Sequence, residues 1–291
     1  MVGVGLLGGS LGMALRKRRL AKSVVGFVRR SASVAECECH GAVDLATLDL
    51  ARAVKGADLI VLCTPIAQMR PLVEQMLPAL RRGAIVTDVG SVKGSVVRDL
   101  ESLVARAGAR FVGSHPMAGA EKTGVAAARA DLFAGAVCAI TPTRRSAPAA
   151  VRKVEQLWKA VGCRLLRLTP EAHDALVSRS SHLPHVVAAQ LANLILNPKY
   201  PAEQGMLCAN GFRDTTRIAA SSPEMWRDIA LANRANLLRA LAAFTAGLQG
   251  FKRALKRGDA RAVSAFFEQA RERREQWSKG AGARRHNRIG E

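Results

Sequence analysis

The glycine pattern at the start of the chain limits the fold more than any other feature of the sequence. Gly3, Gly5 and Gly8 are spaced as GxGxxG. In such a loop the first glycine makes a tight turn, the second lets backbone approach a pyrophosphate, and the third lets a helix pack closely on a sheet. A helical segment follows, and residues 24–28 have the composition of a second buried strand. The pattern therefore predicts a dinucleotide-binding loop formed by Gly3, Gly5, Leu6, Leu7 and Gly8.

Short β-rich runs alternate with helical patterns as far as residue 168. The runs that we expect to form buried strands are 24–28, 59–62, 84–89, 110–113, 136–141 and 164–168. This alternation predicts an α/β fold, with a doubly wound Rossmann-type domain over residues 1–168. Because only Met1 and Val2 precede the first glycine, the first strand of this domain is expected to be truncated.

The second half of the chain has helical patterns and no strand patterns. Thr169-Pro170-Glu171 and Ser222-Pro223-Glu224 are both typical helix starts, with a hydroxyl cap followed by proline. We therefore expect an all-α domain over residues 169–279, with a loop at 197–211. The Gly/Arg-rich residues 280–291 are expected to form a basic tail without ordered structure.

The net charge of +21 raises the question of a nucleic-acid partner. The excess of basic residues is concentrated in residues 16–30 and 252–291, which suggests two terminal patches and not one groove. Aromatic residues make up 4% of the chain, too few for a stacking surface. No nucleic-acid partner is expected. The longest apolar run, 183–196, contains polar residues, and no secretory signal opens the chain, so we expect a cytoplasmic protein without a membrane span.

The residues after the second predicted strand bear on the choice of cofactor. NAD enzymes usually carry an acidic residue here, which binds the ribose 2′-hydroxyl. Arg29 and Arg30 stand at this place instead, and guanidinium groups suit a 2′-phosphate, which favours NADP over NAD. The alternative is a solvated basic turn. Thr64 and Pro65, directly after the strand 59–62, are expected to contact the cofactor at the same sheet edge.

Two further strands are followed by residues that could take part in proton transfer. Ser91 lies in the segment DVGSVKG and His115 in the segment GSHPMAG. The carboxyl ends of parallel strands meet at the edge where such sheets bind substrate. A histidine with an ordinary pKa of about 6.5 can accept a proton there. The alternative is a structural, hydrogen-bonding histidine.

The helical half adds more candidate residues. His182 and His185 are close in sequence, but they lack the HExxH pattern and an accompanying acidic or cysteine cluster, so no metal site is expected. Arg213 and Arg217 are four residues apart, and on one helix face they could bind a carboxylate. The alternative for these arginines is a surface network around Asp214.

Six segments in order make the chain resemble a known family. They are GVGLLGGSLG (3–12), DVGSVKG (88–94), GSHPMAGAEKTG (113–124), SHLPH (181–185), GFRDTTRIA (211–219) and MWRDI (225–229). Together these segments resemble the prephenate/arogenate dehydrogenases, or cyclohexadienyl dehydrogenases, of tyrosine biosynthesis. The resemblance implies an oxidative decarboxylation: hydride leaves C4 of a cyclohexadiene for the nicotinamide, the C4 hydroxyl loses its proton, and CO2 departs as the ring aromatises.

The resemblance also implies roles for individual residues. His115 would be the base at the C4 hydroxyl, with Ser91 orienting that hydroxyl. His185 and Arg217 would contact the substrate, with Arg217 facing a carboxylate. Supporting or access-controlling positions would be His173, His182, Glu121 and Trp226.

The family's helical domain forms a homodimer, and the apolar stretches 183–196 and 231–248 could supply such an interface. Prephenate and arogenate both remain open as the substrate. One alternative function is another Rossmann-type small-acid dehydrogenase, which would share the glycine loop but not the set of Ser91, His115 and Arg217. A second is a non-catalytic nucleotide- or nucleic-acid-binding module, which would explain the charge but not the histidines.

Overall fold

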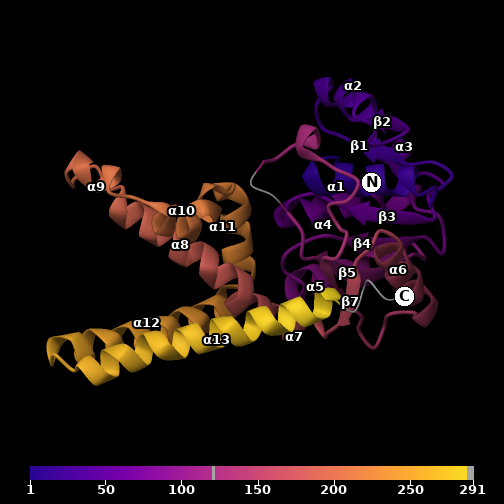
Figure 1. Cartoon of the computed structure of the whole chain (residues 1–291). Coiled ribbons are helices and arrows are strands. Elements are labelled where there is room, and N and C mark those ends of the chain that lie inside the picture. Colours follow the sequence, from indigo (N-terminus) through magenta and orange to yellow (C-terminus); the bar gives the residue numbers. More distant parts are fainter. Residues whose placement is uncertain (120–121, 287–291) are drawn as a thin grey trace. The chain divides into compact units, whose positions relative to one another are not determined.

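The first half of the chain forms a sheet with helices between the strands (Figure 1). The computed structural model describes residues 1–119 and 122–286, with side chains as far as residue 279. The strands are β1 (Val25–Phe27), β2 (Leu45–Thr47), β3 (Leu59–Leu62), β4 (Ile85–Asp88), β5 (Arg110–Pro116), β6 (Val137–Thr141) and β7 (Arg164–Arg167). The helices among them are α1 (Leu6–Lys17), α2 (Ala32–Cys39), α3 (Leu50–Val54), α4 (Ile66–Met76), α5 (Gly94–Arg106) and α6 (Pro148–Ala160), with short 3₁₀ turns η1 (Leu77–Ala79) and η2 (Val125–Ala127).

Val2 occupies the position between β1 and β3. It forms isolated parallel bridges with Phe27 on one side and Leu62 on the other. Its N–H donates to the Val61 carbonyl at 2.9 Å, and its own carbonyl accepts from Cys63 N–H at 2.8 Å. The strands therefore follow the order β2, β1, Val2, β3, β4, β5, β6 and β7, which confirms the Rossmann-type α/β prediction.

Neighbouring strands are parallel except where β5 meets β6. The β5–β6 pair is antiparallel, and β6 and β7 are parallel to each other, so these last two strands run against the rest. All six predicted strands form, but the expected burial is wrong for β7, whose residues are half-buried or exposed. In addition, β5 extends beyond the expected end at Gly113. It continues because His115 and Pro116 pair with Ala139 and Cys138 of β6. His115 therefore lies within a strand and not in the loop after one. The short strand β2 was not predicted.

The two faces of the sheet are covered by different helices. Successive strand residues point to opposite faces. Val61 and Val112 pack in one cluster with residues of α1 and α6, whereas Ile60, Leu62 and Phe111 pack in the other with residues of α4 and α5. Helices therefore cover both faces of the central strands, as the apolar sequences of these strands predict.

The second half of the chain is helical. Its elements are α7 (Pro170–Val177), a π-helical turn η3 (Ser178–His182), α8 (Leu183–Ile195), α9 (Ala202–Met206), α10 (Asn210–Thr216), a 3₁₀ turn η4 (Arg217–Ala220), α11 (Pro223–Ala232), α12 (Arg234–Lys256) and α13 (Ala260–His286). Both predicted helix starts are confirmed: Thr169 Oγ1 accepts from Ala172 N–H at 3.1 Å, and Ser222 Oγ accepts from Met225 N–H at 3.3 Å. Among the described residues, the helices include none that is apolar and long enough to cross a bilayer.

Two segments differ from the sequence prediction. The expected loop 197–211 contains the short helix α9 and the start of α10, because its central residues include good helix formers between the prolines and glycines. The helix α13 continues to His286, so the expectation of a tail without ordered structure is wrong for residues 280–286. Alanine and arginine favour helix strongly enough to carry it past Gly280 and Gly282. The remaining five residues of the tail lie outside the described residues.

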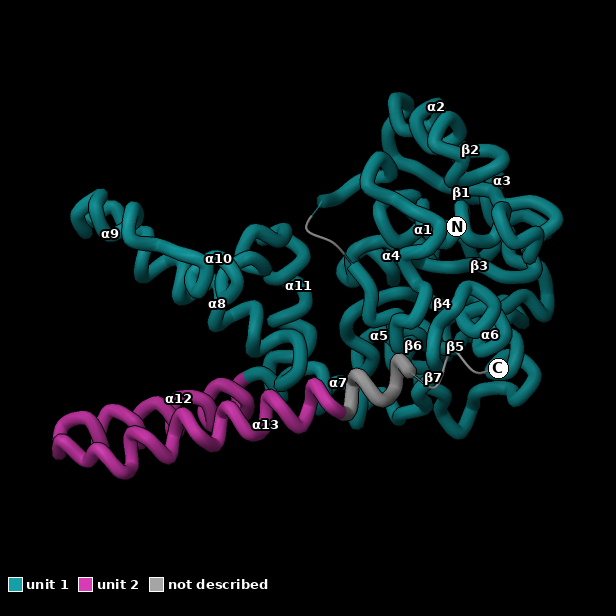
Figure 2. The backbone as a smooth tube through the Cα atoms, in the orientation of Figure 1, with its two compact units in different colours: residues 1–237 teal, residues 238–291 magenta. Residues whose placement is uncertain are grey.

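The chain divides into two compact units (Figure 2). Residues 1–237 form the first, in which α7 packs against α5 and α11 packs against α4. Residues 238–291 form the second, which contains most of α12 and all of α13. These two helices contact each other through the rings of Phe251, Phe266 and Phe267. The domain boundary at residue 168 stays a prediction.

A substitution of Gly12 tests the close approach between α1 and the segment that connects α2 to β2. A Cβ atom there would lie 1.8 Å from the carbonyl oxygen of Ala42. We expect Gly12→Ala to destabilise the protein by about 3 kcal/mol and to lower the thermal unfolding midpoint by about 10 °C, because backbone must move. Gly5→Ala is the matched control, since a Cβ on Gly5 meets no atom within 4 Å. Equal midpoints for the two variants would contradict this account of α1 packing.

Candidate active site

The glycine loop leaves an open space at the start of α1. Gly3 has φ +92°, a conformation that favours glycine, and a Cβ on Gly8 would lie 2.1 Å from the Gly3 carbonyl oxygen. A Cβ on Gly5, by contrast, would meet nothing within 4 Å, and no side chain caps the helix. Leu6 and Leu7 form the first turn, so their N–H groups lie where a helix start attracts an anion. These residues fit a dinucleotide pyrophosphate.

Thr64 and Pro65 lie beside this loop. A Cβ on Gly3 would be 2.9 Å from both the Cys63 carbonyl oxygen and Thr64 Cγ2, so the two loops touch. Thr64 Oγ1 is buried and has no hydrogen-bond partner among the described residues. A buried hydroxyl without a partner is costly unless a ligand satisfies it. Pro65 occupies the N-cap position of α4. Both residues therefore lie where the sequence predicted a cofactor contact.

Arg29 and Arg30 follow β1, separated from it by Val28. Both side chains are exposed, whereas Val28 before them is buried. Their position after the strand next to the glycine loop is the one at which Rossmann-type domains meet the ribose of the adenosine half.

His115 stands at the carboxyl end of β5 and is bonded to a second histidine. His115 Nδ1 lies 2.9 Å from His173 Nε2 of α7, and His173 Nδ1 lies 2.9 Å from Asp174 Oδ1. All three side chains are buried. The Asp174 carboxylate also accepts the backbone N–H groups of Lys93 at 2.7 Å and Gly94 at 2.8 Å. The histidine in the sheet is thus connected to the start of α5 through α7.

A buried ion pair lies behind His115. Lys93 Nζ contacts Asp88 Oδ2, and neither side chain is exposed at all. Lys93 also donates to the Ser114 carbonyl at 2.9 Å, and Asp88 accepts from Gly90 N–H at 2.8 Å and Ser114 N–H at 3.1 Å. Each charge therefore has several partners, which offsets the cost of removing it from water. Ser91 lies between Gly90 and Lys93 and is half-buried.

A second group of aromatic and polar side chains surrounds His182. Its Nδ1 lies 3.2 Å from Asn233 Nδ2, and Asn233 Nδ2 also donates to the Asp174 carbonyl at 2.9 Å. The ring of His185 stacks on Trp226 with centroids 3.7 Å apart, and His182 meets Trp226 edge-on at 5.9 Å. Within the described residues, His182 Nε2 and Trp226 Nε1 are buried without a hydrogen-bond partner. Such atoms are suited to a polar ligand.

The histidines are held neutral by their surroundings. Burial lowers the pKa of His115 well below its ordinary value, and the nearby His173, Lys93 and His182 lower it further. Burial also lowers the pKa of His173, against the opposing effect of Asp174, and lowers that of His182 to about 4. The expectation of an ordinary pKa for His115 is therefore wrong, because the sequence does not show burial. A neutral imidazole can accept a proton.

The two arginines considered as substrate residues lie on neighbouring elements of the helical half. Arg217 begins η4, which packs against α8, the helix that carries His185, and its side chain is exposed. Arg213 lies in α10 and is also exposed. Glu121 lies outside the described residues.

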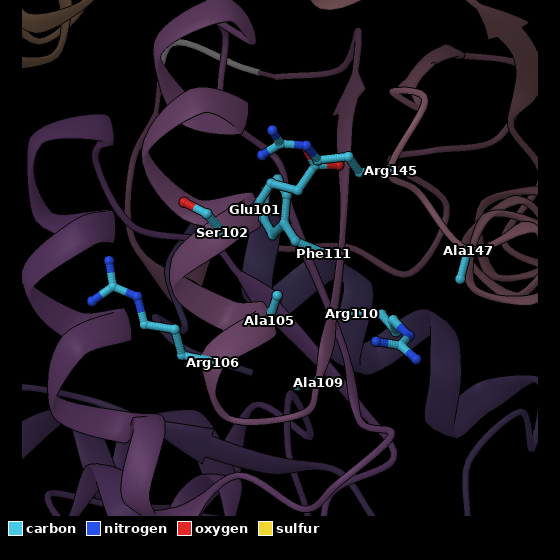
Figure 3. Close-up of a pocket in the computed structure, with 9 residues that line it drawn as sticks. All are labelled: Glu101, Ser102, Ala105, Arg106, Ala109, Arg110, Phe111, Arg145 and Ala147. Atoms are coloured by element: carbon cyan, nitrogen blue, oxygen red, sulfur yellow. The ribbon is translucent and has the colours of Figure 1, made fainter.

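One surface pocket of about 390 Å³ lies elsewhere (Figure 3). It is lined by Glu101, Ser102, Ala105, Arg106, Ala109, Arg110, Phe111, Arg145 and Ala147. Arg110 and Phe111 begin β5, so the pocket lies at the opposite end of that strand from His115. Figure 3 shows that its three guanidinium groups are spread apart and do not converge on one point. The pocket is therefore separate from the candidate active site.

Sequence reasoning missed four residues of the site: Asp88, Lys93, Asp174 and Asn233. Asp88 and Lys93 carried a usable signal, since both are charged and follow a buried strand inside a recognised segment. Asp174 and Asn233 carried none, because helical residues of these types are usually exposed.

Comparison with known proteins agrees with this geometry. The nucleotide-binding domain of prephenate dehydrogenase matches residues 11–167, and its dimerization domain matches residues 169–269. The chain belongs to the prephenate dehydrogenase family. It is 34% identical to the prephenate dehydrogenase of Bacillus subtilis, over 94% of this chain and 74% of that protein. It is 32% identical to the cyclohexadienyl dehydrogenase of Zymomonas mobilis, over 94% of both proteins.

Solved structures of the prephenate dehydrogenase family have the same fold. The Aquifex aeolicus prephenate dehydrogenase, in complex with hydroxyphenyl propionate and NAD+, superposes with a TM-score of 0.88 and 32% identity, covering 94% of this chain and 96% of that one. The Synechocystis arogenate dehydrogenase superposes with a TM-score of 0.77 and 30% identity, covering 95% and 98%. The chain is thus a dehydrogenase with a nucleotide-binding domain for a nicotinamide cofactor, and its helical domain is of the dimerization type.

Lys93→Met is a test of the ion pair. We expect it to destabilise the protein by about 3–5 kcal/mol, because it leaves the Asp88 carboxylate buried without its counter-ion. Since the Lys93 charge lowers the pKa of His115, the variant should also titrate His115 at a higher pH. Urea unfolding and histidine NMR titration measure the two effects.

Asp88→Asn combined with Lys93→Met is the matched control. It removes both charges and should recover much of the lost stability. A single variant as stable as the original protein would show that the pair contributes nothing.

Proposed function

We propose that this protein catalyses the NAD(P)-dependent oxidative decarboxylation of prephenate or arogenate, giving 4-hydroxyphenylpyruvate or tyrosine. The observation that carries the proposal is a buried, neutral His115 at the sheet edge that also carries the glycine loop. Membership of the prephenate dehydrogenase family supports it. The family includes proteins named for each substrate, and both stay open here.

The bound nicotinamide would supply the hydride acceptor, and the residues of the chain would manage the proton. His115 accepts the proton of the C4 hydroxyl while hydride leaves C4, and Ser91 orients that hydroxyl. Because the pKa of His115 is lowered, the ring is neutral and ready to accept at neutral pH. Burial of the histidine group excludes water, which strengthens each polar contact with the substrate.

The helical residues would hold the rest of the substrate. Trp226 Nε1 and His182 Nε2 are buried ring nitrogens for which the described part of the chain has no partner at hydrogen-bond distance, and His185 stacks on Trp226. Arg217 supplies a guanidinium for a substrate carboxylate, and Glu121 is proposed to control access to the site. Guanidinium and imidazole groups suit a dianionic substrate.

We assign NADP as the preferred cofactor. Arg29 and Arg30 are both exposed after β1, where a 2′-phosphate would lie, and the sequence from Val28 onward has no acidic residue before Glu36. Gly3, Gly5, Leu6, Leu7 and Gly8 would hold the pyrophosphate, and Thr64 and Pro65 would contact the cofactor from the next loop.

We also propose a homodimer through the helical domain. The dimerization-domain match supports it. Exposed apolar side chains support it as well: Leu194 and Leu196 at the end of α8 in the first unit, and Leu238, Phe244 and Leu248 in the second.

The decisive experiment is an assay of the purified protein with prephenate and with arogenate, each combined with NAD and with NADP. Reduced cofactor formed together with CO2 from at least one substrate is the expected result. Absence of turnover in all four combinations, by a protein that binds cofactor, would overturn the proposal in favour of another small-acid dehydrogenase.

Replacing Arg29 and Arg30 together by alanine tests the cofactor assignment. We expect kcat/KM for NADP to fall about 10- to 100-fold, because two charged hydrogen bonds to the 2′-phosphate are lost, while the value for NAD changes little. The exposed pair Arg144 and Arg145, replaced in the same way, is the control. An original protein that prefers NAD would show that the assignment is wrong.

His115→Asn tests the base. The amide keeps a polar side chain but cannot take up the proton, so kcat should fall about 100- to 10,000-fold with a much smaller change in KM. A base works only when neutral, so kcat of the original protein should fall as the pH drops through the pKa of His115 in the complex. Because that pKa is lowered, the fall should begin below pH 6.5. If the variant keeps the same acidic limb, the base is His182 or His185 instead.

A further inference from the structure

One ring nitrogen of His115 is hydrogen-bonded to another histidine of the protein. Its Nδ1 lies 2.9 Å from His173 Nε2, and the two rings meet edge-on with centroids 5.1 Å apart. His173 is fully buried and uses its other nitrogen, Nδ1, to reach Asp174 Oδ1 at 2.9 Å. The three side chains thus form one hydrogen-bonded row from α7 to β5.

The carboxylate end of this row determines where the protons lie. An ionised carboxylate only accepts hydrogen bonds, so the proton of neutral His173 must be on Nδ1. His173 Nε2 then carries a lone pair and can only accept, so the proton of His115 must be on Nδ1 as well. It follows that Nε2 of His115 is the nitrogen with the free lone pair.

Asp174 is held in place from several directions. Its two oxygens accept the N–H groups of Lys93 at 2.7 Å and Gly94 at 2.8 Å at the start of α5. A Cβ on Gly94 would lie 2.8 Å from Asp174 Oδ2, so a glycine permits this approach. Backbone donors at a helix start favour the ionised carboxylate. The acceptor that orders the row is therefore fixed by the fold and does not depend on a ligand.

Burial is the main reason that both rings stay neutral, because it lowers the pKa of each. His173, Lys93 and His182 lower the pKa of His115 further. At His173, Lys93 also lowers the pKa, whereas Asp174 and Asp88 oppose this effect. A protonated His173 would donate from Nε2 and would force the His115 proton onto its Nε2, which would block the base.

We propose that His173 and Asp174 are positioning residues that hold His115 in its Nδ1–H tautomer, with Nε2 free to take the substrate proton. The inference rests on the proposed function for its catalytic meaning, but the tautomer itself is a property of the protein without substrate. When the O–H bond of the substrate breaks and an Nε2–H bond forms on His115, the resulting positive ring donates from Nδ1 to His173, which is backed by the Asp174 negative charge.

The first test is the NMR spectrum of the original protein with ¹⁵N-labelled histidine at neutral pH. Nitrogen shifts distinguish the two neutral tautomers, and loss of a signal in His115→Asn assigns His115. We expect the Nδ1–H tautomer for both His115 and His173. An Nε2–H tautomer at His115 overturns the proposal, whatever the enzyme assay shows, and an assay without turnover leaves the tautomer result standing.

The second test compares two substitutions of His173. His173→Phe fills the space without an acceptor, so His115 should lose the Nδ1–H preference and kcat should fall about 10- to 100-fold with little change in KM. His173→Gln can place an amide oxygen near the former Nε2, so it should recover the tautomer and much of kcat. If His173 only filled space, His173→Phe would keep a higher kcat than His173→Gln, and this result would contradict the proposal.

His40→Gln is the matched control. His40 is exposed, and its Nδ1 contacts the Glu36 carbonyl of its own helix. This variant should leave both kcat and the His115 signal unchanged. If His173→Phe does not fold, the tautomer of the original protein still decides the proposal.

Discussion

The buried pair of Asp88 and Lys93 is the interaction on which the site depends. Two charges that water cannot reach are stable only when donors and acceptors surround them. Asp88 obtains its donors from Lys93 Nζ, Gly90 N–H and Ser114 N–H, and Lys93 obtains a second acceptor from the Ser114 carbonyl. The loop after β4 is thereby held against β5. This network fixes the position of Ser91, which lies in that loop, and of His115, which follows Ser114.

The same loop connects the sheet to the helical half of the chain. Directly after Lys93, α5 begins, and its first N–H groups are bonded by Asp174 from α7. The backbone carbonyl of Asp174 in turn accepts from Asn233, which also contacts His182. Asp174 thus bonds the start of α5 and the histidine row through its carboxylate, and the end of α11 through its backbone carbonyl. The polar groups that are buried here are therefore hydrogen-bonded to one another.

The candidate chemistry lies at one edge of the sheet, and the chain direction explains why. Parallel strands bring their carboxyl ends together, so the glycine loop after Val2, Thr64 after β3 and Ser91 after β4 share an edge with His115 in β5. The strands β6 and β7 run the other way. The strand β6 pairs with the part of β5 that carries His115, and neither β6 nor β7 contains a residue of the predicted cofactor loops.

The sequence by itself determined the α/β order, the strands of the first half, the helix starts at Thr169 and Ser222, and the glycine loop. These features depend on the spacing of residues close to one another in sequence, so they can be read before the chain folds. Only the tertiary structure decided that His115 lies inside a strand, that its pKa is lowered, and that Asp174 and Asn233 belong to the site. Burial, charge pairing and hydrogen bonds between residues far apart in sequence, such as Gly94 and Asp174, exist only once the chain has folded, because they depend on which surfaces meet.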